Sequence, residues 1–310
     1  MKIGVILPLF SGDPHKVVAA AREAEDLGFD GVFVFDHLFP PGAPPDRPAL
    51  EAFAALGAVA AATERVAVGT LVTRASLRPV GMLAKMASWL DVVAGGRLIL
   101  GIGTGDPIDR GEHAAYGIPM FDKAERREHL RETVLALKAL FGGHPYPGGR
   151  LVPPIDGPLR PPPVRPGGPP VWVGAQAQEV IRIAGEVADG WNGWGLDVDA
   201  FAARGRLLTE ARDGARTTGG GGRGRGVPEA TWAGIALVGS DEDELERLWE
   251  RRRAQGLTEE VWTGTAPDLV RFLDALADAG ASWAVIVTAG PSDRRRLLAE
   301  AVLPALRARR

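Results

Sequence analysis

The residue pair best suited to chemistry is Asp36-His37, which comes directly after the apolar stretch Gly31–Phe35. An imidazole beside a carboxylate can donate or accept a proton near neutral pH. The alternative is structural, with the two side chains bracing the loop that follows. The other histidines fall in predicted helices or loops away from strand ends, where a surface role is expected: His15, His113, His129 and His144.

A second polar pair follows the sequence GRLILGIGTGD at residues 96–106. Its apolar residues predict a strand buried on both faces, and Thr104 and Asp106 come just beyond the end of that strand. The pair is therefore a candidate for the active site, and Asp106 is a candidate catalytic residue. Alternatively, Asp106 makes an Asx-turn ahead of Pro107. The glycines are not a dinucleotide fingerprint, because no helix begins after them.

A third feature could bind an anion. Gly174, Ala175 and Gln176 lie between an apolar stretch and a predicted helix, and Asp189-Gly190 lies at the next turn. Backbone N–H groups at the start of a helix bind phosphate, and small residues allow close approach. The same residues could instead make only a tight turn.

Other catalytic machinery is missing from the sequence. It has no cysteine, no G-x-S-x-G elbow, no Walker loop and no histidine pair at the i, i+4 spacing of a metal site. We therefore expect no metal centre. Chemistry carried by a bound organic cofactor fits better, since such a cofactor needs fewer special side chains.

These residues become neighbours if the strands form one parallel sheet. Apolar strands alternate with helical periodicity along the chain, and a buried strand follows a glycine-ended helix in both residues 26–35 and residues 278–287. Eight such strands predict an α/β fold, a (β/α)8 TIM barrel with insertions, whose strand ends meet at one rim. A doubly wound open sheet is the alternative.

Length and charge set further expectations. The 310 residues fit one barrel domain spanning residues 1–310, and a net charge of −3 gives no reason to expect nucleic acid as a partner. No segment reaches the roughly 20 apolar residues of a membrane span. We therefore expect a cytoplasmic protein that acts on a small molecule.

Three segments interrupt the repeating pattern. Residues 103–122 form a loop long enough to be a functional lid. The proline-rich residues 142–170 predict an irregular excursion with a short hairpin. Residues 217–226 are rich in glycine and arginine, which is typical of a flexible surface loop, with an RNA-binding segment as the alternative.

The chain resembles the bacterial luciferase-like family, in particular its deazaflavin-dependent oxidoreductases. The resemblance rests on five pieces in the family's order: FVFDHL (33–38), VGTLVT (68–73), GGRLILGIGTGD (95–106), VWVGAQ with ADGWN (171–176 and 188–192), and GTAPDLVRFLDALADAG (264–280). It implies a modified (β/α)8 barrel. Family members often dimerise, so a homodimer is also implied.

The resemblance further implies coenzyme F420, a deazaflavin, with its ring near Asp36, His37 and Thr104 and its phosphate near residues 174–176. A non-prolyl cis peptide between Leu71 and Val72 would back the ring. His37 matches a polar group that the family places beside the reacting carbon. Asp106 is one methylene shorter than the corresponding family glutamate.

The resulting hypothesis is an oxidoreductase that passes a hydride between F420 and an organic substrate, with His37 and Asp106 as its catalytic residues. Relatives that oxidise sugar phosphates carry a tryptophan where this chain has Pro40-Pro41, so a sugar-phosphate substrate is not expected. Trp194 could supply an apolar wall or lie in the core. The alternatives are an FMN-dependent monooxygenase that activates oxygen and a non-catalytic flavin-binding barrel.

Overall fold

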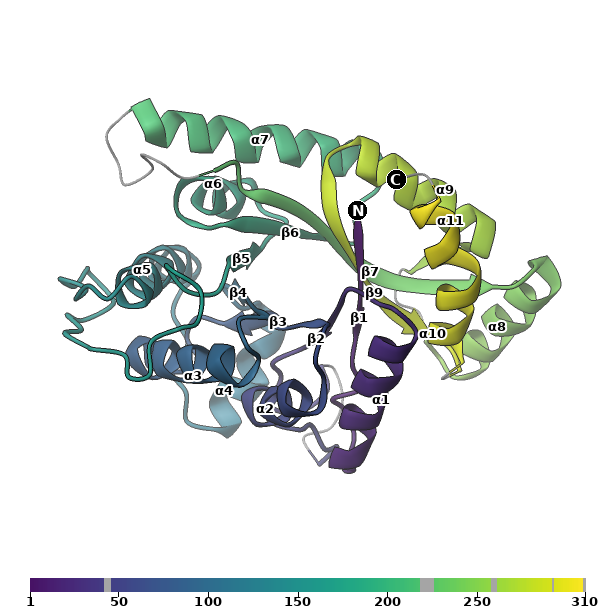
Figure 1. Cartoon of the computed structure of the whole chain (residues 1–310), viewed down its shortest axis with the longest axis horizontal. Helices are drawn as coiled ribbons and strands as arrows, with labels where there is room; N and C mark the ends of the chain where they lie inside the picture. Colours follow the sequence, from purple (N-terminus) through teal and green to yellow (C-terminus); the bar gives the residue numbers. More distant parts are fainter. Residues whose placement is uncertain (42–45, 218–225, 258–260, 292, 309–310) are drawn as a thin grey trace.

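The computed structural model describes residues 1–41, 46–217, 226–257, 261–291 and 293–308. Its described strands form a closed parallel barrel with helices around the outside (Figure 1). The barrel strands are β1 (Lys2–Ile6), β2 (Gly31–Val34), β3 (Ala67–Arg74), β4 (Leu98–Gly103), β5 (Val171–Gly174), β6 (Gly190–Trp194), β7 (Glu229–Gly239) and β9 (Ala281–Ala289). Pairing of β6 with β7 closes the ring, which confirms the predicted (β/α)8 barrel and excludes the open sheet.

The helices follow the strands in the expected alternation. They are α1 (Pro14–Asp26), α2 (Ala52–Ala62), α3 (Val80–Val93), α4 (Arg110–Ala115), α5 (Lys123–Phe141), α6 (Gln178–Val187), α7 (Val198–Thr217), α8 (Glu242–Ala254), α9 (Ala266–Asp278), α10 (Arg294–Leu297) and α11 (Leu303–Arg307), with a 3-10 turn η1 (Pro107–Asp109) and a π-helical turn η2 (Leu298–Val302). Local signals explain their ends. The Asp13 carboxylate accepts the N–H of His15 at 2.9 Å, and Gly28 follows α1 at φ +86°.

One strand was not predicted. The short β8 (Trp262–Thr265) pairs with residues 236–239 at the carboxyl end of β7, outside the closed ring. Three of its four residues are only partly buried, so it lacks the continuous apolar character that identifies a barrel strand.

The three long connecting segments agree with their predictions to different degrees. Tyr146 and Ile155 form an antiparallel bridge within residues 142–170, as the predicted hairpin requires. The predicted lid at residues 103–122 contains η1 and α4 rather than irregular chain. Most of the glycine- and arginine-rich tract lies outside the described residues.

An aromatic cluster fills the barrel interior. The rings of Phe33, Trp172 and Trp283 lie with their centroids 5.7–5.8 Å apart, and all three side chains are buried. Leu71 packs in the same cluster and also reaches the carboxyl rim. The cluster therefore closes the interior beneath the rim, as layered side chains do in such barrels.

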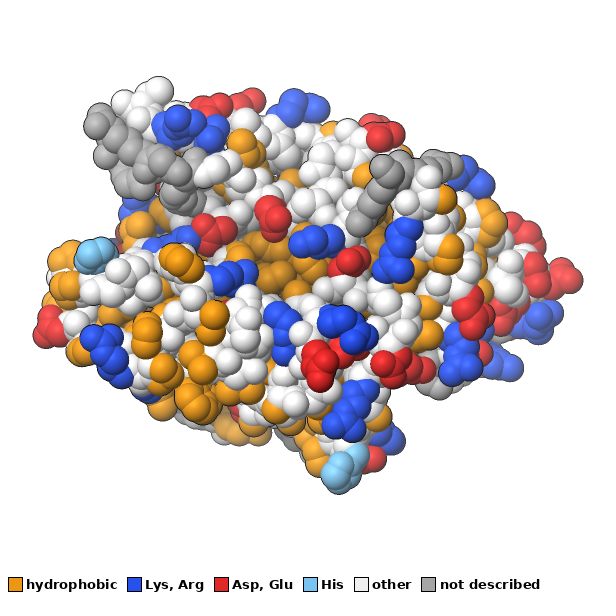
Figure 2. All heavy atoms as spheres, viewed as in Figure 1, with side chains coloured by type: hydrophobic (Ala, Val, Ile, Leu, Met, Phe, Trp, Pro, Cys, Tyr) orange, Lys and Arg blue, Asp and Glu red, His pale blue; other side chains and the backbone are white. Residues whose placement is uncertain are grey.

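The surface offers no large area of one charge on the face seen in Figure 2, where acidic and basic side chains are interspersed. Among the described residues, none of the helices combines the length and apolar character that crossing a membrane requires.

Close packing of β3 on β4 gives a first prediction. A Cβ built on Gly101 would lie 2.2 Å from the Thr70 carbonyl oxygen, a backbone atom that cannot turn aside. We expect Gly101→Ala to lower the free energy of unfolding by at least about 2 kcal/mol, because overpacking displaces the strand. Urea denaturation measures this change.

Gly57→Ala is the matched control for this prediction. Gly57 lies in α2, and a Cβ there would meet nothing within 4 Å. The same substitution should therefore stabilise the protein by about 0.5–1 kcal/mol through helix propensity. A Gly101→Ala protein as stable as wild type would show that the two strands are not packed this closely.

Candidate active site

A cavity of about 690 Å³ opens at the carboxyl ends of the barrel strands. All the barrel strands are parallel, so the residues that follow them meet at this rim. The cavity wall includes most of the residues predicted for the site: Asp36, His37, Leu71, Val72, Thr104, Asp106, Gly174, Ala175 and Gln176. Apolar side chains, among them Phe10, Phe35, Trp194 and Ile235, make up much of the rest.

Asp189 and Gly190 do not line this cavity. The Asp189 carboxylate accepts the N–H of Val171 at 2.8 Å and pairs with Lys138, and Gly190 is the first residue of β6. Both residues therefore lie where strands β5 and β6 begin, at the opposite end of the barrel. The structure therefore does not bring them to the rim cavity with the other predicted cofactor-binding residues, because a turn that precedes a strand lies at the amino edge of a parallel sheet.

The bulge in β3 matches the expectation from the resemblance. The peptide bond between Leu71 and Val72 is cis, and the register of β3 against β4 shifts between Thr70 and Thr73. Both Leu71 and Val72 line the cavity. A Cβ on Gly103 or Gly174 would meet the Val72 side chain within 3 Å, so these glycines make room for it.

The Asp36 carboxylate is hydrogen-bonded to side chains within the protein. Its carboxylate is 2% exposed and accepts hydrogen bonds of 2.5 Å from Thr73 Oγ1 and from Arg78 Nη1. Arg78 also pairs with Glu51. Burial alone would lower the pKa of Arg78, but the bonds and charges of Asp36 and Glu51 outweigh it and raise that pKa. Asp36 therefore acts first as an anchor of this end of the barrel.

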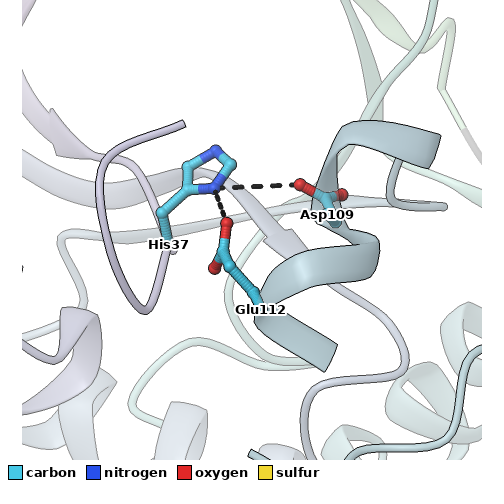
Figure 3. A group of neighbouring side chains, drawn as sticks. All are labelled: His37, Asp109 and Glu112. Carbon is cyan, nitrogen blue, oxygen red and sulfur yellow. Dashed lines mark hydrogen bonds and ion pairs between the residues drawn. The ribbon is translucent and has the colours of Figure 1, made fainter. Parts of the chain in front are cut away.

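His37 is held by a residue that the sequence did not suggest. Its Nδ1 lies 2.7 Å from Glu112 Oε1 and 3.8 Å from Asp109 Oδ1 (Figure 3). The second ring nitrogen lies on the side of the ring away from Glu112 (Figure 3). The His37 side chain is 21% exposed, whereas that of Glu112 is 2% exposed.

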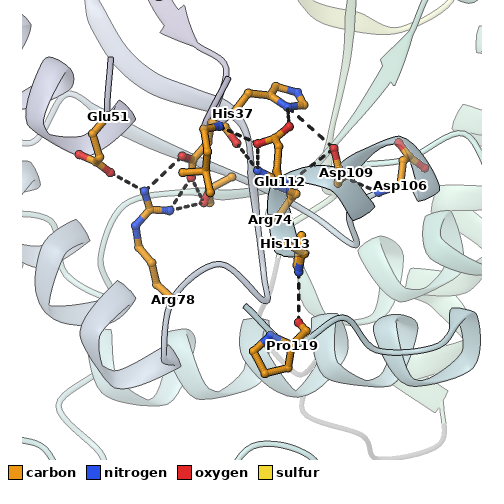
Figure 4. A network of polar contacts seen from close by, with 12 residues as sticks. His37, Glu51, Arg74, Arg78, Asp106, Asp109, Glu112, His113 and Pro119 are labelled. Atoms are coloured by element: carbon orange, nitrogen blue, oxygen red, sulfur yellow. Dashed lines mark hydrogen bonds and ion pairs between the residues drawn. The ribbon is translucent and has the colours of Figure 1, made fainter. Parts of the chain in front are cut away.

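Glu112 is surrounded by donors. Its Oε2 accepts a hydrogen bond of 2.6 Å from the Leu38 N–H. The same oxygen accepts one of 2.6 Å from Arg74 Nη2 (Figure 4). Burial would raise the pKa of Glu112, but the hydrogen bonds from His37, Leu38 and Arg74 lower it below its usual value. An ionised carboxylate can only accept, so the proton of His37 is on Nδ1 and Nε2 is free to accept another.

Asp109 completes the network. Its Oδ2 accepts the N–H of Asp106 at 2.7 Å, and its Oδ1 lies 3.4 Å from Arg74 Nη1. Ligand atoms of His37, Asp109 and Glu112 lie within 4.8 Å of one another, a spacing that could hold a metal ion. Arg74 pairs with both carboxylates, so we interpret the group as an ion-pair network.

Asp106 is not the residue that hydrogen-bonds His37. It is an exposed residue on the rim of the cavity, and Glu112 holds the histidine in its place. The sequence carried a weak signal, since Asp109 and Glu112 are three residues apart and share one face of a helical turn. That signal required a helix inside the segment that was predicted to be a loop.

The far end of the cavity is the start of α6. Gly174, Ala175, Gln176 and Ala177 line it, and Ala177 caps the helix without a side-chain hydrogen bond. The first N–H groups of a helix have no partner within the helix. An anionic group in the cavity would find donors here.

A parallel barrel with a cavity at its carboxyl rim is the architecture expected from the resemblance to the luciferase-like family. The family model for luciferase-like monooxygenases matches residues 1–255, so the chain belongs to that family.

Its relatives include F420-dependent glucose-6-phosphate dehydrogenases. The protein of that name from Beutenbergia cavernae is 35% identical over 185 residues, which cover 57% of this chain and 52% of the relative. For Kineococcus radiotolerans the identity is 33% over 211 residues, covering 66% and 60%. The matches thus span little more than half the length of these curated relatives.

Solved structures share the fold over nearly the whole chain. An F420-dependent secondary alcohol dehydrogenase in complex with an F420-acetone adduct superimposes with a TM-score of 0.81 at 19% identity, covering 98% of each chain. The F420-dependent tetrahydromethanopterin reductase from Methanopyrus kandleri gives 0.78 at 20% identity, covering 98% of this chain and 99% of that one.

Proposed function

We propose that this protein is an oxidoreductase that transfers a hydride between coenzyme F420 and a small organic substrate. The observation that carries the proposal is one cavity with a histidine held by Glu112 at one end and, at the other, the start of a helix without a side-chain cap. Several relatives bear names of F420-dependent enzymes, which supports the choice of cofactor.

The cavity fits such a cofactor. Its volume lies in the range of about 300–1,000 Å³ typical of small-molecule sites. The apolar side chains of Val72 and Trp194 suit a flat ring, and the N–H groups at the start of α6 suit a phosphate. When bound, F420 would supply the carbon that accepts or donates the hydride.

The chain's own residues would handle the proton. His37 Nε2 would take the proton of a substrate hydroxyl, or return one to a carbonyl. Glu112 would keep Nδ1 protonated and stabilise the imidazolium that forms, while Arg74 and the Leu38 N–H hold Glu112 ionised. The phenyl rings of Phe10 and Phe35 would limit the access of water to His37.

The test is a binding titration with F420 and FMN side by side, followed through tryptophan fluorescence. We expect saturable quenching by F420 at concentrations where FMN has little effect. A Trp194→Phe variant should lose part of this signal, because Trp194 lines the cavity. Preferential FMN binding with oxygen uptake by the reduced complex would favour a monooxygenase, and binding of neither cofactor would refute the proposal.

A further inference from the structure

The cavity wall is poor in available positive charge. Of the lining residues that the structure describes, Arg74 is the single one with a permanent positive charge. Its guanidinium is 4% exposed and lies between two carboxylates, with Nη2 2.6 Å from Glu112 and Nη1 3.4 Å from Asp109 (Figure 4). Arg74 is therefore already neutralised.

The neighbouring cation is committed as well. Arg78 donates to Asp36 at 2.5 Å and also pairs with Glu51. Its guanidinium lies over the phenyl ring of Phe53. A substrate phosphate would have to displace one of these carboxylates to use either arginine. Breaking a buried ion pair in this way is costly.

Negative charge, by contrast, is available at the wall. Asp106 is exposed on the rim, and Asp109 is one of two carboxylates that share the single positive charge of Arg74. The remainder is mostly apolar, with Phe10, Ile108 and Ile235 on different sides. With the start of α6 taken by the cofactor phosphate, an anionic substrate would meet like charges and apolar surface, which disfavour its binding.

From this arrangement we infer that the substrate is an uncharged alcohol or carbonyl compound with an apolar body and no phosphate. The inference rests on the proposed function and separates this chain from relatives named for a sugar phosphate. In the oxidative direction the alcohol carbon would lose a hydride, which carries two electrons, to bound F420. The hydroxyl proton would go to His37 Nε2 as the C=O bond forms, so that one hydride and one proton leave the substrate.

Binding to the F420-loaded protein tests the inference, measured by calorimetry on three compounds with one ring skeleton. They are cyclohexanol, trans-2-aminocyclohexanol and the phosphate monoester of trans-cyclohexane-1,2-diol. We expect cyclohexanol to bind on the order of 10²-fold more tightly than the phosphate, because of the like charges at the wall. The ammonium compound separates the effect of charge from that of bulk.

A variant tests whether the charge of Asp106 causes the weaker binding of the phosphate. Asp106→Asn should reduce the ratio of the binding constants of cyclohexanol and the phosphate several-fold. Glu246→Gln, an exposed change on α8, should leave this ratio unchanged. Repeating the measurement on protein without cofactor keeps the test independent of the proposed cofactor, since the charges belong to the cavity wall. Equal or tighter binding of the phosphate, equal weakening by phosphate and ammonium, or no binding of any compound would overturn the inference.

Discussion

Replacing His37 with alanine is expected to lower kcat for F420-dependent turnover by about 10²–10⁴-fold, the range for loss of a general acid or base. The reason is the arrangement of the ring, with Nδ1 held 2.7 Å from Glu112 and Nε2 left to carry the proton. F420 binding should change little, because the helix N–H groups at the other end of the cavity are untouched. Stopped-flow reduction of F420 and the binding titration measure the two effects separately.

His144→Ala provides the control for this prediction. His144 is exposed just beyond α5 and has no part in the network around His37, so its removal should leave kcat unchanged. If His37→Ala turned over at the wild-type rate, His37 would not be the proton carrier.

Replacing Glu112 with alanine should have the largest effect on stability. The change leaves the Arg74 guanidinium buried beside Asp109 alone and removes the acceptor of the Leu38 N–H. Loss of one partner of a buried pair costs about 3–5 kcal/mol, which urea denaturation would show. Glu246→Ala, an exposed change on α8, should stay within about 0.5 kcal/mol of wild type.

The same residue gives a pH dependence with a defined sign. The pKa of Glu112 is lowered in the folded protein from its ordinary value of 4.5. Its ionisation therefore stabilises the fold above about pH 4.5, and this stabilisation is lost as the pH falls through the lowered value. The stability difference between wild type and Glu112→Gln should shrink as the pH drops below 4.5. A difference that grows on acidification would mean that Glu112 is protonated in the native state.

Much of the barrel was predictable because its strands are buried on both faces and its helices carry clear end signals. The strands β2 and β4 are buried at every position, which makes them continuous apolar stretches in the sequence. The short β8 lacks such an apolar stretch, since it lies outside the ring and three of its four residues are only partly buried. Burial on both faces is thus what made a strand recognisable.

The site was predictable only in part. Asp36, His37 and Thr104 were found because they follow strands, and strand ends meet at one rim. Glu112 was not, because it comes from a short helix within a long connection, and its position depends on how that segment folds back over β2 and β3. Asp189 lies away from the cavity because its turn precedes β6, and the start of a barrel strand lies at the end opposite to the rim.

A crystal structure of the F420 complex would show whether the cofactor binds in the rim cavity, which is the decisive test of the proposed site. We expect the ring to lie in the rim cavity against Val72 with His37 Nε2 facing the substrate side, and the phosphate to accept from the N–H groups at the start of α6. A complex in which F420 binds outside this cavity, or in which its phosphate lies away from the start of α6, would contradict it.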